Sequence, residues 1–280
     1  MMNASLNRLV RSGLLVLVAW LGMGQVAAQG PLVLTAAPRE NPEQGMQLYG
    51  PLAQRMSEAL GREVQYRHPG NWLAYQRDMR NEVFDIVLDG PHLIAWRIHE
   101  IDHAPLARMP GQLMFVVIVP ETDTSIQSLD DLVARRVCAV APPNLAPLVL
   151  LSQYPNTIRQ PMIHPARRGM QQAFEQFRAG ECVAAALPAG FYNNILSDED
   201  REGTRILFRS EGLPQQGFTA GPRVDEQGRQ ALRELLTTDG EQSTAPLLRR
   251  FAGDATRLIP VAQGEYDPHY LLLKGVIFGW

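Results

Sequence analysis

Lysine is almost absent from this chain of 280 residues: Lys274 is the single lysine among 26 basic residues, and the others are arginines. The basic residues are offset by 29 acidic ones, which leaves a formal net charge of −3 at pH 7. Without an excess of positive charge, binding to nucleic acid or to an anionic membrane surface is disfavoured. Composition bias accounts for the arginines, although a guanidinium also suits bidentate recognition of oxyanions.

Signatures of common catalytic sites are also missing. The sequence contains no G-x-S-x-G, no H-E-x-x-H, no phosphate-binding Walker loop and no cysteine–histidine signature. His99 and His103 have the four-residue spacing of a helical metal site, but Pro105 follows too closely for a long helix. We therefore predict no catalytic residue, no metal and no cofactor, and expect that the protein is not an enzyme.

An apolar block preceded by basic residues lies near the beginning of the chain. Arg8 and Arg11 precede an apolar block at 14–21, and small residues follow at 26–28. This order is typical of a secretory signal peptide, predicted here as residues 1–28 with cleavage after Ala28. The apolar block is short for a membrane span, and an uncleaved anchor is the alternative.

Cysteine is scarce, and both cysteines lie in the exported part of the chain. Cys138 and Cys182 are therefore predicted to form a disulfide, because export brings a chain into an oxidising compartment. A thiol pair for a soft metal or arsenite is the alternative. No histidine or third cysteine lies nearby in sequence to complete a metal site, which favours the disulfide.

Short apolar runs alternate with amphipathic segments along most of the remaining chain. Residues 32–36 and 86–88 have the length and composition of buried strands. After a loop at 38–45, residues 49–60 have the apolar face of a helix that ends at Gly61. Such alternation predicts βαβ units with parallel strands. Further strands are expected at 64–66, 113–119, 136–140, 161–164, 183–187 and 218–220, and helices at 72–80, from 92, and at 129–133, 146–152, 169–178, 226–237 and 245–251.

Two series of alternating elements predict an α/β protein with two lobes. Each lobe is expected to be a mainly parallel sheet flanked by helices, and crossover strands are expected to join the lobes as a hinge. Lobe 1 is predicted at 29–118 and 219–280, and lobe 2 at 119–218. No Ser/Gly-rich linker separates them, and the apolar tail at 270–280 is expected to dock. The cleft between such lobes is the expected ligand site.

Five stretches of the chain occur in a characteristic order. They are residues 34–42 (LTAAPRENP), 49–53 (YGPLA), 81–92 (NEVFDIVLDGPH), 128–138 (SLDDLVARRVC) and 178–186 (RAGECVAAA). In this order they resemble the phosphate/phosphite/phosphonate-binding periplasmic proteins of ABC importers, over most of 32–192. The resemblance implies the type 2 periplasmic binding fold, a periplasmic location and a small anionic or polar solute. It also implies a permease in the inner membrane as partner, and a monomer.

The resemblance weakens where phosphonate-binding members hold the oxyanion. Those members use a Ser/Thr-rich turn at the start of the helix after the first strand of lobe 2. Here residues 141–146 read APPNLA, in which two prolines lack N–H donors and no hydroxyl is present, although Asn144 can cap the helix. A family histidine is replaced around Arg168, and a family acidic residue is replaced at Leu187-Pro188. The identity and the charge of the solute therefore stay open.

The strand that stops at Gly90-Pro91 is the strongest single indication of a ligand site. A helix resumes at His92, and the carboxyl end of such a strand offers unpaired N–H groups to small ligands, especially anions. The alternative for this segment is an ordinary strand–turn–helix connection. For each candidate side chain, the alternative to ligand binding is a role in capping, packing or surface solvation. Tyr49 matches the family's ligand-touching tyrosine. The predicted ligand-binding residues are Arg39, Tyr49, Asp89, Gly90, Pro91, His92, Asn144, Leu145 and Tyr192.

Three functions are compatible with this reading of the sequence. The leading hypothesis is a periplasmic solute-binding protein of an ABC importer that binds a phosphonate-like or other small polar solute between its lobes. A ligand sensor that partners a membrane histidine kinase is the alternative. An exported enzyme on the same fold is the third, and turnover of a candidate substrate by purified protein would support it. A neighbouring gene for a permease or for a kinase would separate the first two.

Overall fold

The computed structural model describes residues 30–238 and 243–273. The expected signal peptide therefore lies outside the described residues, as does most of the apolar tail. From Leu32 onward the chain forms one compact unit. Within the described ranges, no helix combines the length and the apolar character that crossing a bilayer requires.

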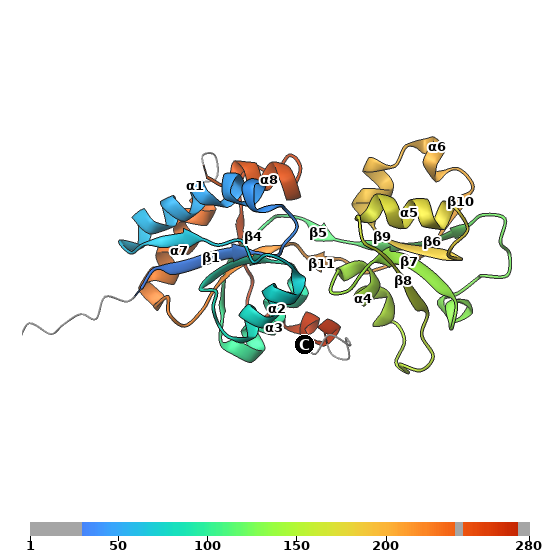
Figure 1. Cartoon of the computed structure of the whole chain (residues 1–280), viewed down its shortest axis with the longest axis horizontal. Coiled ribbons are helices and arrows are strands. Elements are labelled where there is room, and N and C mark those ends of the chain that lie inside the picture. The colour runs from blue at the N-terminus through green and yellow to red at the C-terminus, as the bar shows by residue number, and fades with distance from the viewer. Residues whose placement is uncertain (1–29, 239–242, 274–280) are drawn as a thin grey trace, which may run out of the picture. The chain divides into compact units, whose positions relative to one another are not determined.

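The first sheet has six strands. β1 (Leu32–Ala36) pairs in parallel with β2 (Val64–Tyr66) and β3 (Ile86–Asp89), whereas β12 (Gly217–Ala220) runs antiparallel to β3 and to β4 (Ala104–Arg108). β13 (Ile259–Pro260) completes the order β13-β4-β12-β3-β1-β2. The helical segments around this sheet are α1 (Pro42–Leu60), α2 (Trp72–Arg80), α3 (Pro91–Ile101), α7 (Glu226–Thr238), α8 (Ala245–Phe251) and η3 (Asp267–Leu273) (Figure 1).

The second sheet has five strands in the order β10-β6-β9-β7-β8. β7 (Arg136–Val140) pairs in parallel with β8 (Met162–Ala166) and β9 (Ala184–Pro188), and β6 (Phe115–Pro120) runs antiparallel to β9 and to β10 (Thr204–Arg209). Its helical segments are η1 (Leu129–Leu132), α4 (Leu145–Leu151), α5 (Met170–Arg178), the π-helical turn η2 (Phe191–Ile195) and α6 (Asp198–Arg201). Between the two sheets, β5 (Gln112–Leu113) pairs with β11 (Leu213–Pro214) (Figure 1).

The two sheets confirm the two-lobed α/β fold and correct the predicted lobe boundaries. β6 belongs to the second sheet, so the chain leaves lobe 1 before Phe115 and not after residue 118. β12 belongs to the first sheet, so the chain has returned by Gly217. We define lobe 1 as the described residues 32–109 and 217–273, and lobe 2 as residues 115–210. An apolar run shows that a strand forms but does not show which sheet it joins.

One predicted boundary that the structure corrects is the start of α1. The helix begins at Pro42, although residues 38–45 were expected to be a loop. The Asn41 side chain accepts a hydrogen bond from the Gln44 N–H at 2.9 Å, and the Gln44 side chain accepts one from the Asn41 N–H at 3.3 Å. This capping box, followed by proline at the first helical position, starts the helix seven residues early.

The predicted disulfide is confirmed. Cys138 on β7 is bonded to Cys182, which lies between α5 and β9. Cys138 is completely buried, and Cys182 packs with Phe174 and Phe177 of α5. The bond therefore ties the helix to the sheet that it covers.

Removing the disulfide should destabilise the protein. The bond joins cysteines that are 44 positions apart, and for a loop of that length the chain-entropy model gives roughly 4 kcal/mol as an upper value. We expect the Cys138→Ala/Cys182→Ala double variant to lose up to that free energy of unfolding in urea, followed by circular dichroism. Wild type in reductant should show the same loss. An unchanged urea midpoint in both would contradict a stabilising role.

Candidate functional site

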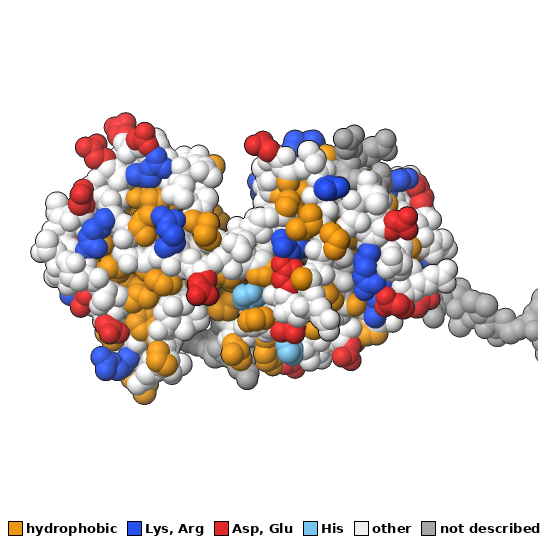
Figure 2. All heavy atoms as spheres, turned by 180° about the vertical axis from the view of Figure 1, so that it is seen from behind, with side chains coloured by type: hydrophobic (Ala, Val, Ile, Leu, Met, Phe, Trp, Pro, Cys, Tyr) orange, Lys and Arg blue, Asp and Glu red, His pale blue; other side chains and the backbone are white. Residues whose placement is uncertain are grey.

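The candidate site lies where the carboxyl ends of parallel strands meet. β1, β2 and β3 end at one edge of the lobe 1 sheet, and β7, β8 and β9 end at one edge of the lobe 2 sheet. His92, just after β3, contacts the carbonyl oxygen of Pro143, just after β7, so the two edges face each other there. Figure 2 shows a notch between the parts of the molecule that hold the two sheets. Such edges are where α/β proteins bind small ligands.

The turn after β3 brings lobe 1 close to lobe 2. Gly90 precedes α3, Pro91 occupies its first position, and both are buried. A Cβ atom at Gly90 would lie 3.2 Å from His92 Cε1 and 3.6 Å from Leu145 Cδ1. A side chain at this position would crowd the His92 ring, whereas Leu145 of lobe 2 lies at an ordinary contact distance. The backbone conformation of Gly90 is one that any residue adopts.

Asp89 is engaged in a buried network within lobe 1. Its Oδ1 accepts a hydrogen bond from the Tyr75 hydroxyl at 2.5 Å, and its Oδ2 accepts one from Arg97 Nε at 2.9 Å. Arg97 also donates to the Tyr75 hydroxyl at 3.0 Å, and none of the three side chains is exposed. Burial, with Asp89 alongside, raises the pKa of Tyr75 well above its usual value. In this structure both carboxylate oxygens of Asp89 are engaged by protein side chains, and a ligand contact of Asp89 stays a prediction.

His92 is paired with the other lobe. Its Nε2 lies 2.9 Å from the Pro143 carbonyl oxygen, and because a carbonyl can only accept, Nε2 carries the proton. Nδ1 is buried and has no hydrogen-bond partner among the described residues. Burial lowers the pKa of His92 to about 3, so the ring is neutral at physiological pH. In this arrangement the ring contacts a carbonyl instead of the anion that was expected.

The start of α4 offers few donors to a ligand. Asn144 caps the helix as expected, its side chain accepting from the Ala146 N–H at 3.3 Å. Pro147 has no N–H, so the first turn keeps only the N–H of Leu145. Leu145 is nearly buried beside Gly90. Further along α4, Leu148 packs in an apolar cluster of lobe 1.

Tyr49 lies inside α1, not at its start. Its side chain is completely buried and stacked on Tyr66, with ring centroids 5.1 Å apart. The hydroxyl has no hydrogen-bond partner among the described residues. Burial raises the pKa of Tyr49 well above its usual value, and the nearby Glu40 carboxylate raises it further. A buried hydroxyl without a partner is costly and uncommon, which makes it a good indicator of a ligand contact.

Charged side chains gather around Tyr49. Arg39 Nη1 donates to Gln216 Oε1 at 2.6 Å, and the Arg39 guanidinium lies over the Phe251 ring, 5.7 Å from its centroid. Arg250 on α8 approaches Glu40, with Nε 3.3 Å from Oε1. Two arginines and one glutamate give this group a formal charge of +1. Sequence reasoning found Arg39 but missed Glu40 and Arg250, which are 210 positions apart in the chain.

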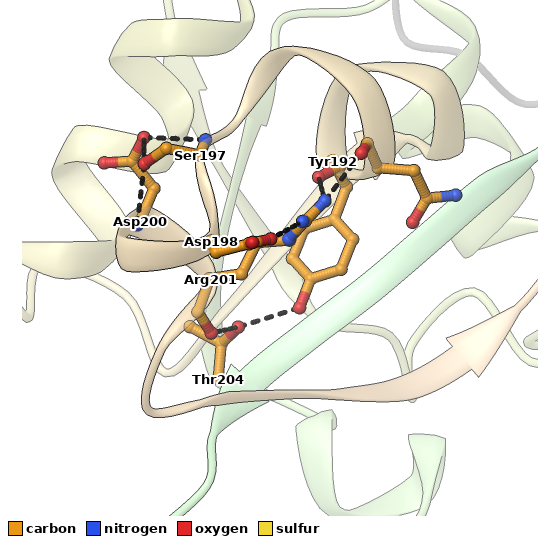
Figure 3. Close-up of polar contacts among 7 residues, drawn as sticks. Tyr192, Ser197, Asp198, Asp200, Arg201 and Thr204 are labelled. Carbon is orange, nitrogen blue, oxygen red and sulfur yellow. Dashed lines mark hydrogen bonds and ion pairs between the residues drawn. The ribbon is translucent and has the colours of Figure 1, made fainter.

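Tyr192 lies away from the facing edges, and its ligand role stays a prediction. Its hydroxyl is 2.9 Å from Thr204 Oγ1. Figure 3 shows this contact as a dashed line. Thr204 pairs with Pro120 at one end of β6, whereas the ligand-facing end of β9 at Pro188 pairs with Phe115 at the other. Tyr192 therefore lines an open hollow near α6, with Glu121, Asp198 and Glu202, at the opposite end of the sheet.

The structure separates the two histidines that had the spacing of a metal site. His99 packs against Tyr270, and His103 is buried with its Nδ1 3.0 Å from Thr219 Oγ1, beyond the end of α3. In the ranges that the structure describes, no three His, Cys, Asp or Glu side chains are grouped as metal ligands.

Residues 34–266 match the family described as "ABC transporter, phosphonate, periplasmic substrate-binding protein". No curated protein sequence matches the chain at a significant level.

Several solved structures share the fold at low sequence identity. PhnD1 from Prochlorococcus marinus, in complex with methylphosphonate, is 17% identical with a TM-score of 0.63, covering 86% of this chain and 96% of that one. XAC2383 from Xanthomonas citri, bound to ATP, is 15% identical with a TM-score of 0.68, covering 87% and 97%. The phosphonate-transporter binding protein PA3383 from Pseudomonas aeruginosa is 12% identical with a TM-score of 0.58, covering 87% and 86%.

Removing Asp89 should be far more damaging than removing an exposed aspartate. Asp89→Ala leaves the guanidinium of Arg97 buried without its counter-charge, a change that typically costs about 3–5 kcal/mol. The matched control is Asp198→Ala, whose carboxylate pairs with Arg201 but is 96% exposed, so a loss below about 1 kcal/mol is expected. Urea unfolding of both variants provides the measurement. Equal losses would show that the buried network does not stabilise lobe 1.

Proposed function

Because the chain belongs to the family of periplasmic substrate-binding proteins of phosphonate ABC transporters, we propose that it binds a small anionic solute of the phosphonate-like class. The proposed site is the notch between the lobes, at the facing edges of the two sheets. The solute is passed to a permease in the inner membrane. The protein acts as a monomer in the periplasm after removal of residues 1–28, and it transforms nothing chemically.

The observation that carries this proposal is the unpartnered hydroxyl of Tyr49 beside a group of net positive charge. A ligand oxygen near Arg39 and Arg250 would accept from this hydroxyl and satisfy it. The net charge of +1 favours an anion, and the guanidinium groups match the geometry of an oxyanion. We therefore assign the ligand contacts to Tyr49 and Arg39, with Glu40 and Arg250 setting the charge around them.

Lobe 2 contributes less charge to this site. The turn before α4 presents Pro142 and Pro143 without N–H groups, and the Asn144 side chain is used as the helix cap. An oxyanion is therefore held mainly from lobe 1, and the group of Arg39, Arg250 and Glu40 balances one negative charge better than two. This favours a solute of single negative charge over a doubly charged phosphonate.

Transport is favoured over sensing because the family consists of transport proteins. The same family description favours a binding protein over an enzyme. PhnD1, which shares the fold, binds methylphosphonate. Methylphosphonate is therefore the first probe for this chain, followed by phosphate, phosphite, sulfonates and carboxylates.

Replacing Tyr49 by phenylalanine should weaken the binding of an oxyanion. Calorimetric titration with methylphosphonate should give a Kd about tenfold or more higher for Tyr49→Phe, because a hydrogen bond to a charged oxygen is lost. The matched control is Tyr154→Phe, whose hydroxyl donates to the Leu129 carbonyl in lobe 2, and its Kd should be unchanged. If Tyr49→Phe binds as tightly as wild type, Tyr49 is not a ligand contact. If wild type binds none of the oxyanions in the panel, the proposed ligand class is wrong.

A further inference from the structure

A buried hydrogen bond connects the two facing edges directly. His92 belongs to lobe 1, Pro143 belongs to lobe 2, and the 2.9 Å bond between Nε2 and the carbonyl oxygen spans the lobes. Apolar side chains surround the hydrogen bond between His92 and Pro143. Leu145 approaches Gly90, and Leu148 of α4 packs with Leu93 and Trp96 of α3. A hydrogen bond shielded in this way is stronger than one exposed to water.

We propose that His92 is a proton-sensitive latch, whose neutral ring holds the lobes together through Pro143 and whose protonation favours their separation. This inference goes beyond the proposed ligand class, because the latch closes the cleft with or without a particular solute. It requires three properties: a bond between lobes, a ring that is neutral when bound, and an environment that rejects the charged ring.

The surroundings of His92 supply no partner for a second ring proton. In the described residues, Nδ1 has no acceptor. The charged and titratable groups that face the ring are Arg39 from the loop after β1 and His269 from η3, and both disfavour a positive charge. The facing helix α4, with the sequence LAPLVLL, carries no titratable side chain. The ion pair of Asp89 and Arg97 is internally neutral.

The direction of the pH effect follows from these contacts. In the closed protein, burial lowers the pKa of His92 to about 3, and this outweighs the bond to Pro143, which by itself would favour the cation. With the lobes apart, the exposed ring returns toward its ordinary pKa of 6.5. The closed form therefore binds fewer protons, so closure is fully favoured above about pH 7 and weakens as the pH falls through 6.5. At pH 5 the closing equilibrium should be about thirty-fold less favourable than at pH 8.

Small-angle X-ray scattering of the ligand-free protein at pH 8 and pH 5 tests the latch. Wild type should show a larger radius of gyration at pH 5. His92→Gln keeps an N–H donor but has no group that titrates, so its radius should not change between the two pH values. His92→Ala lacks the donor, and its radius at pH 8 should be the larger one.

Two histidine variants serve as controls. His164→Gln removes a histidine of lobe 2 that pairs with Glu181, away from the junction, and should leave the pH response intact. His269→Gln removes the neighbouring ring and should retain most of the response. A radius of wild type that is the same at both pH values would overturn the proposal, as would an unchanged pH response in His92→Gln. Because the scattering needs no ligand, these results are independent of whether methylphosphonate binds.

Discussion

The ion pair between Asp89 and Arg97 is the constraint on which the geometry of the site depends. Asp89 is the last residue of β3, and Arg97 lies two turns into α3, so the bond ties the end of the strand to the helix that follows. Tyr75 of α2 closes the network from a third element. A buried ion pair of this kind is weak evidence for stability, because desolvation offsets most of the attraction, but it does select one arrangement. With the angle between β3 and α3 fixed, His92 is directed at lobe 2.

The two lobes contribute different chemistry to the facing edges. Lobe 1 brings Tyr49 and the charged residues around it, whereas lobe 2 brings the carbonyl of Pro143 and the apolar start of α4. When a ligand contacts both lobes of a cleft, the contacts that bind the ligand are also the contacts that hold the lobes closed. Here the bond that spans the lobes belongs to the protein, so the closed state can be populated before the ligand arrives. A ligand then shifts the equilibrium only by the difference between its affinities for the open and closed forms.

The sequence predicted what depends on local pattern and missed what depends on pairing across the chain. Apolar runs located β1, β3 and β7, and export together with two cysteines predicted the disulfide. The early start of α1 was detectable, because Asn41 and Gln44 have the spacing of a capping box. The contact between Glu40 and Arg250 was not, since no local signal connects residues 210 positions apart. Tyr192 follows β9 closely in sequence, but the turn of η2 carries its hydroxyl toward Thr204, away from the edge where β9 ends, and sequence spacing alone does not show this.

The two prolines before α4 and the presence of His92 can be understood together. A turn rich in hydroxyl and N–H groups donates hydrogen bonds and suits an anion. Pro142 and Pro143 remove two N–H groups but keep their carbonyls, so the turn becomes an acceptor and no longer attracts an oxyanion. An acceptor at this position must be matched by a donor when the lobes approach, because a buried unpaired carbonyl is costly. His92 supplies that donor from lobe 1 without adding a charge. If this edge serves closure, as we propose, recognition of the solute falls to Tyr49 and its charged neighbours.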